Sequence, residues 1–137
     1  KTEIGEMIMK NLKKIIATSL CAGILSISAV SAAGYAGYKL PRFQGNNYTN
    51  SHSKTTSANY ITHKLENVEG TSTVTFWACN STKRQISNDY DQKKGSTANI
   101  KFTTSGYAAK GKEIIMGMEN ANFSPDTAFC AGTVNYR

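Results

Sequence analysis

The side chains that could perform acid–base or metal chemistry are two histidines and one short acidic segment. His63 alternates with Ile61 and Leu65 on an apolar strand face, which is typical of a core or rim histidine. His52 lies in a segment rich in Ser, Thr and Asn, and we expect it to be solvated. The segment 88–91 (Asn-Asp-Tyr-Asp) places two carboxylates at alternate positions, but it lacks the fuller spacing of a calcium loop. We therefore predict no catalytic residue, no metal site and no cofactor, so that the protein is not an enzyme.

Other catalytic signatures are also missing. The chain contains no hydrolase elbow, no phosphate-binding glycine loop and no zinc-helix motif. A wall-polymer enzyme stays as the weakest alternative, with His63, Asp89 or Asp91 as its candidate residues.

The cysteines indicate a disulfide. The chain has three of them, Cys21, Cys79 and Cys130, and Cys21 lies in a segment that we expect to be removed. The remaining even pair in an exported protein predicts a Cys79–Cys130 bridge. It would close a loop of about 50 residues and stabilise the fold by about 4 kcal/mol in the loop-entropy model. A two-cysteine metal site would need further ligands, which His52 and His63 do not supply at a suitable spacing.

The N-terminal segment has the pattern of a cleavable secretory signal peptide. Three lysines (Lys10, Lys13 and Lys14) precede an uncharged stretch from residue 15 to 30, and small residues follow at 31–34. We expect residues 1–8 to be an N-terminal extension that is mostly or wholly untranslated and was included by an over-long gene prediction. Residues 9–32 are expected to be a helical signal peptide, with cleavage before Ala33. The alternative, a membrane anchor, would need about 20 apolar residues. Residues 33–137 then form a single secreted β domain, whose segment 33–57 is partly flexible.

Charge limits the partners of the exported part. Removing residues 1–32 takes away four basic and two acidic residues of the 16 and 9 in the chain, which leaves 12 basic against 7 acidic residues and a net charge of +5. Such a charge favours an anionic cell-envelope component or an envelope protein as partner. Basic and aromatic residues do not interleave on one face, so we expect no nucleic acid partner. Contact with a membrane is expected only transiently, through the signal peptide.

Short runs of alternating residues separated by turn signals predict strands. No 3.6-residue period follows the signal, which favours an all-β fold: a small antiparallel β-sandwich or barrel of five to seven strands. The expected strands cover residues 35–40 (an edge strand ended by Pro41), 58–68, 72–79, 97–103, 113–119 and 127–136; residues 45–57 and 80–96 are expected to be polar loops.

The run from Ser72 to Cys79 is apolar on both faces. Trp77 shares one face with Cys79, while Val74 and Phe76 share the other. A strand of this kind is usually central and covered on both sides. The alternative is an aromatic face left exposed for binding.

The chain resembles a family of small secreted β-domain proteins of Gram-positive bacteria and, more distantly, the lactococcin-type β-sandwich bacteriocins. The resemblance rests on the Lys-Lys signal, the Thr-Val-Thr-Phe-Trp strand (residues 73–77) and the Lys-Lys-Gly-Ser turn (residues 93–96). It implies export by the general secretory route and action on cell-wall synthesis, but it transfers no functional residue.

These observations favour a secreted, non-enzymatic binding or antagonism protein that acts at the bacterial cell envelope in a bacteriocin-like way. The alternative is a structural or adhesive protein that stays at the cell surface. In either case the residues that bind the target are not identified by the sequence.

Overall fold

The computed structural model describes residues 32–137. The expected extension and the expected signal peptide, apart from Ala32, lie outside the described residues, as does Cys21. Within residues 32–137 no helix is long and apolar enough to cross a membrane.

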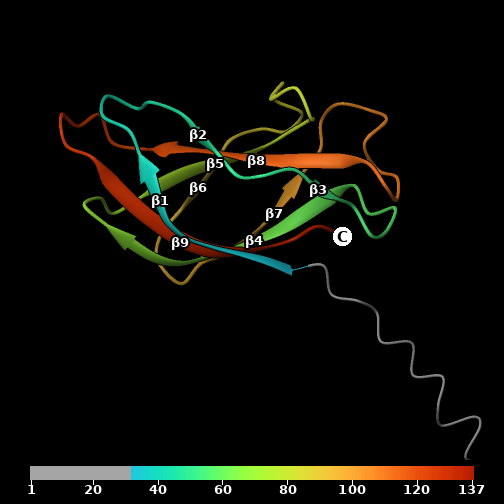
Figure 1. The fold of residues 1–137 in the computed structure, drawn as a ribbon, viewed down its shortest axis with the longest axis horizontal. Helices are drawn as coiled ribbons and strands as arrows, with labels where there is room; N and C mark the ends of the chain where they lie inside the picture. Colours follow the sequence, from blue (N-terminus) through green and yellow to red (C-terminus); the bar gives the residue numbers. More distant parts are fainter. Residues whose placement is uncertain (1–31) are drawn as a thin grey trace, which may run out of the picture.

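The described chain folds as a two-sheet antiparallel β-sandwich, with the sheets face to face (Figure 1). Sheet A has the strand order β1-β9-β4-β7, and sheet B the order β2-β8-β5-β6, with β3 also paired to β8. The strands are β1 (Ala32–Leu40), β2 (Asn47–Tyr48), β3 (His52–Ser53), β4 (Tyr60–Glu69), β5 (Val74–Cys79), β6 (Tyr90–Gln92), β7 (Thr97–Lys101), β8 (Glu113–Asn120) and β9 (Ala128–Asn135).

The all-β sandwich is confirmed, but the expected count of five to seven strands is wrong because the described residues form nine. The extra strands β2, β3 and β6 have two or three residues each and lie in segments expected to be polar loops. So short a strand shows no alternation. It forms because a longer neighbour, β8 or β5, offers free backbone groups at its edge.

The core lies between the sheets and follows the alternation of the long strands. Ile61 and Leu65 of β4 and Met116 and Met118 of β8 are fully buried in it. Their outward neighbours on β4 are less buried: Thr62 is half-buried and Lys64 is exposed. The predicted inner faces of β4 and β8 are thus confirmed.

Strand β5 is buried along its whole length, as its doubly apolar pattern predicts. Val74, Phe76 and Ala78 belong to the core between the sheets, whereas Trp77 and Cys79 form a second cluster on the outer face with Ile115. The Trp77 ring lies against Gly117, and the Tyr48 ring meets it edge-on at 6.3 Å. Coverage of both faces of β5 is therefore confirmed.

Two β-bulges interrupt sheet A on either side of β9. On β1 the register shifts between Tyr35 and Tyr38, and on β4 it shifts between Leu65 and Asn67. Both extra residues lie opposite the same short stretch, residues 130–132 of β9. A bulge bends its strand and reverses which face the later side chains occupy.

Candidate functional site

Cys79 and Cys130 are free thiols in the structure, so the disulfide expected between them is not formed there. Cys130 points into the core from sheet A and lies 3.6 Å from the sulfur of Met118. Cys79 lies in sheet B on the outer face, in the cluster around Trp77. Packed sheets are about 10 Å apart, whereas the Cβ atoms of a disulfide are about 3.8 Å apart. The two side chains therefore do not meet, because Cys130 faces the core from sheet A whereas Cys79 faces outward from sheet B.

Burial also makes both thiols unreactive. It raises the pKa of Cys79 to about 11, and that of Cys130 to about 11 as well. Since the thiolate is the nucleophilic form, neither cysteine is activated for covalent chemistry at neutral pH.

His63 is the centre of a buried hydrogen-bonded chain. Its Nδ1 lies 2.6 Å from Oε1 of Gln92, and its Nε2 lies 2.8 Å from the hydroxyl of Tyr35. The Gln92 amide nitrogen donates to the Ser96 carbonyl at 3.1 Å, which turns Oε1 toward the imidazole. Nδ1 therefore carries the proton, and Nε2 accepts from Tyr35. Of the two positions expected for His63, core or rim, the structure shows the core.

The protonation states of His63 and Tyr35 favour a structural role for this hydrogen-bonded network. Desolvation lowers the pKa of His63 to about 4, despite the opposing hydrogen bond to Gln92. Desolvation also raises the pKa of Tyr35 far above its usual value. Both side chains are therefore neutral at physiological pH, and each has its hydrogen-bond partners inside the protein.

The acidic segment that could have bound calcium is occupied with other contacts. Asp91 accepts a hydrogen bond from the Thr75 hydroxyl at 2.6 Å, and Asp89 accepts one from the Gln85 amide at 2.8 Å. Burial, together with the charges of Asp89 and Asp91, raises the pKa of nearby Glu119. In residues 32–137 no group of three or more His, Cys, Asp or Glu side chains is placed to hold a metal ion.

His52, expected to be solvated, is half-buried and stacks on the ring of Tyr136 at 4.6 Å. It lines a small cavity of about 150 Å³ between β1 and the β2–β3 segment, together with Tyr35, Tyr38 and Thr49. Tyr35, which lines this cavity, is also the residue whose hydroxyl bonds Nε2 of His63.

A larger hollow lies on the outer face of sheet A, where the two bulges flank β9. Its volume is about 380 Å³, and we call it the sheet A hollow; its lining residues are Gly37, Asn67, Glu69, Phe129, Cys130 and Ala131. Gly37, at the β1 bulge, adopts a φ of 64°, which favours glycine, and nothing would contact a Cβ added there. With Ala131 opposite, the small side chains leave the middle of the hollow open.

The β4 bulge places two polar side chains at this hollow. Before the bulge Ile61, His63 and Leu65 face the core; after it Val68 pairs with Cys130 on the core side. Asn67 and Glu69 therefore point outward, beside Ala131 and Phe129 respectively. Both are exposed, and no hydrogen bond from a described residue reaches either side chain.

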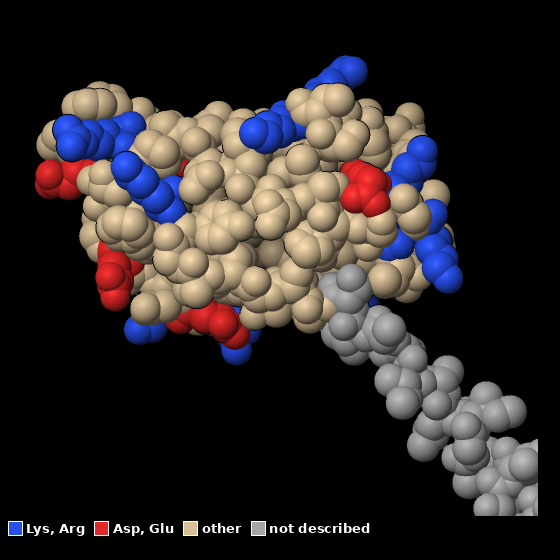
Figure 2. Space-filling model, in the orientation of Figure 1, with Lys and Arg blue, Asp and Glu red and all other residues tan. Residues whose placement is uncertain are grey.

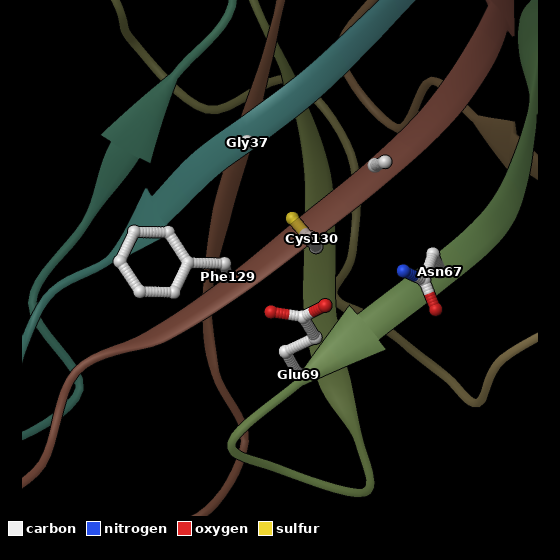
Figure 3. A pocket seen from close by; sticks show the side chains of 6 residues that line it. Gly37, Asn67, Glu69, Phe129 and Cys130 are labelled. Atoms are coloured by element: carbon white, nitrogen blue, oxygen red, sulfur yellow. The ribbon is translucent and has the colours of Figure 1, made fainter.

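Three strands contribute a row of contrasting side chains at the end of the hollow. Phe129 of β9 pairs with Lys39 of β1 on one side and with Glu69 of β4 on the other. Directly paired residues point to the same face of a sheet, so a cation, an aromatic ring and a carboxylate lie side by side. In Figure 3 the Phe129 ring leans toward the end of β1, while the Glu69 carboxylate points from the end of β4 toward β9.

Strict alternation along β4 does not predict this hollow. It would put residue 67 on the core side with residues 61, 63 and 65, whereas the bulge turns it outward. The one available signal was Phe129, an aromatic residue whose neighbours in β9, Ala128 and Cys130, face the other way. In the structure Phe129 is 43 % exposed.

Comparison with known proteins gives a distant likeness of fold. No family model and no curated protein matches the chain. The structure is similar to a crystal structure of PirA, at 8 % identity over 77 % of this chain and 93 % of that one, with a TM-score of 0.43. It is also similar to a family two carbohydrate esterase from Cellvibrio japonicus, at 8 % identity over 77 % of this chain and 33 % of that one, with a TM-score of 0.35. The resemblance to the lactococcin-type bacteriocins stays a prediction.

Proposed function

We propose that this chain is an exported, non-enzymatic binding protein that acts at the bacterial cell envelope, with the outer face of sheet A as its contact surface. The observation that carries the proposal is that the reactive side chains and the solvent-exposed polar side chains lie in different parts of the fold. The reactive groups His63, Cys79 and Cys130 are buried and neutral, whereas the outer face of sheet A presents its polar groups to solvent.

The outer face has the composition of a polar contact surface. Along β9 the residues Phe129, Ala131, Thr133 and Asn135 are more exposed than their inward neighbours. Their partners on β4, and in turn the β7 partners of β4, continue the face with hydroxyl, amide, ammonium and carboxylate groups, namely Thr62, Lys64, Asn67, Glu69, Thr97, Asn99 and Lys101. Hydrogen-bonding groups on a rigid sheet suit recognition of a polar polymer, because little conformational entropy is lost on binding.

The expected export signal and the net charge of +5 on residues 33–137 support the envelope as target. Charge alone is a weak basis for specificity. On the side drawn in Figure 2, basic side chains lie around the rim and are mixed with acidic ones rather than gathered in one patch. The shape and polar groups of the sheet A face must therefore supply the selectivity.

Sedimentation with isolated envelopes of Gram-positive bacteria tests this proposal. We expect the purified protein to bind envelopes saturably, to slow the growth of sensitive cells, and to release no soluble wall fragments. Absence of both binding and growth inhibition would overturn it, and release of fragments would favour an enzyme. Recovery only on the producing cells would favour the structural or adhesive alternative.

A charge-matched pair of variants locates the contact surface. Lys64→Glu with Lys101→Glu reverses two charges on the outer face of sheet A. Lys110→Glu with Lys112→Glu makes the same change in the exposed connection before β8. We expect the first pair to weaken envelope binding and the second to change it much less. Equal losses would mean that total charge, not this face, controls binding.

A further inference from the structure

We propose that the sheet A hollow binds an uncharged N-acetylhexosamine ring of an envelope glycan, with Phe129 as its stacking surface and Asn67 and Glu69 as its polar contacts. This inference rests on the proposed function and names the ligand class and the residues that select it.

The size and shape of the hollow suit a sugar ring. Its volume of about 380 Å³ lies at the lower end of the roughly 300–1,000 Å³ of small-molecule sites. The two bulges and the small residues Gly37 and Ala131 keep its middle open. Because it lies on a sheet face, a ring within a longer chain can enter while its neighbours continue along the face.

Phe129 supplies the apolar contact that such a ring needs. It is 43 % exposed, so part of its ring surface is available to a ligand. One face of a pyranose consists of C–H groups, which pack against the negative face of an aromatic ring. Since β9 lies between β1 and β4 in sheet A, Phe129 is held by hydrogen-bonded strands on both sides.

The two polar side chains match an acetamido group. The amide of Asn67 offers both a donor and an acceptor, and the carboxylate of Glu69 accepts hydrogen bonds. An acetamido group and the ring hydroxyls offer the complementary N–H, C=O and O–H groups. Neither protein side chain has a partner among the described residues, so binding does not require breaking an internal hydrogen bond.

Charge selects against anionic polymers at this position. Glu69 is the charged residue that lines the hollow, and it would repel a phosphate or a carboxylate. Lys39, beyond Phe129 in the same row, lies two strand spacings from Glu69, which is about 10 Å. The net positive charge of the chain can therefore attract the envelope, while the hollow itself takes an uncharged ring.

NMR titration with a chito-oligosaccharide, a soluble oligomer of N-acetylglucosamine, tests the inference. We expect saturable amide shifts at Gly37, Asn67, Glu69 and Ala131, and weaker or absent shifts with poly(glycerol phosphate). Phe129→Ala should lower the affinity roughly tenfold or more, because it removes the stacking surface. Asn67→Ala and Glu69→Gln should each lower it severalfold.

Phe123→Ala is the matched control. Phe123 is 73 % exposed and packs on Phe43 at 5.2 Å, but it does not line the hollow. We expect this variant to bind as the unchanged protein does, and Trp77 fluorescence reports whether each variant is folded.

The outcomes separate the two proposals. Failure to bind the oligosaccharide, equal binding by the Phe129→Ala variant, or preference for poly(glycerol phosphate) would overturn the ligand assignment. If the protein still binds envelopes in that case, the proposed function stands without this site. If it binds neither envelopes nor sugar, both proposals are wrong.

Discussion

The hydroxyl of Tyr35 donates a hydrogen bond to Nε2 of His63 over 2.8 Å, in the space between the sheets. The two rings are also stacked, with their centroids 5.8 Å apart. Gly132 separates them from the outer face, since a Cβ at Gly132 would lie 2.8 Å from the Tyr35 hydroxyl and 2.9 Å from Nε2 of His63. The hydrogen-bonded Tyr35 and His63 side chains therefore lie directly beneath the part of β9 that the two bulges flank.

The neutral state of His63 makes stability depend on pH. Its pKa is about 4 in the folded protein, against about 6.5 in the unfolded chain. Between these values the unfolded state binds more protons, so the free energy of unfolding falls as pH falls from 6.5 to 4. The loss attributable to His63 is about 3 kcal/mol. Urea denaturation between pH 7 and pH 4 measures it. A His63→Asn variant, although less stable, should lose less over the same interval, and an equal loss would assign the effect to other groups.

Gly132→Ala should destabilise the domain by about 3 kcal/mol, because its Cβ would meet the Lys64 carbonyl at 2.5 Å and disturb the Tyr35–His63 hydrogen bond. Thermal denaturation measures the loss. Gly34→Ala, on the neighbouring strand, is the control: its Cβ would meet nothing closer than 4.0 Å, so the change should stay within about 0.5 kcal/mol. Similar losses in both variants would contradict the close packing beneath Gly132.

Gly117→Ala should displace the indole of Trp77, because the new Cβ would overlap with Cε2 and Nε1 of its ring. Trp77 is the single tryptophan of the chain, so its fluorescence reports the change directly. We expect a shift of emission to longer wavelength and a loss of about 1–3 kcal/mol of stability. Unchanged emission would mean that Trp77 does not lie against Gly117.

Because Cys79 and Cys130 are free thiols, we expect a reductant to leave the stability of the domain unchanged. Cys79 and Cys130 should react slowly with a thiol reagent in the folded protein, since they are buried and each has a pKa of about 11. Both should react fully after denaturation, and a reductant should leave the unfolding midpoint unchanged. A mass lower by two hydrogens, with loss of about 4 kcal/mol on reduction, would instead show that the disulfide forms.

Alternation within single strands was enough to predict the all-β fold class and the inner faces of β4 and β8. Alternation in β4 and β8 placed Ile61 and Met116 in the core, because side chains of a strand alternate between faces and apolar ones avoid water. The same rule placed His63 at the core or its rim and predicted β5 as a doubly covered strand. These features depend on neighbours within one strand, which a sequence shows directly.

The cysteine placement, the short strands and the sheet A hollow depend on how distant segments pair. Whether Cys79 meets Cys130 depends on which sheet and which face each occupies. The strands β2, β3 and β6 exist through pairing with distant segments. The sheet A hollow depends on two bulges that reverse the alternation, which turn Asn67 and Glu69 outward beside Phe129. A bulge is a mismatch between two paired strands, so one strand's sequence does not reveal it.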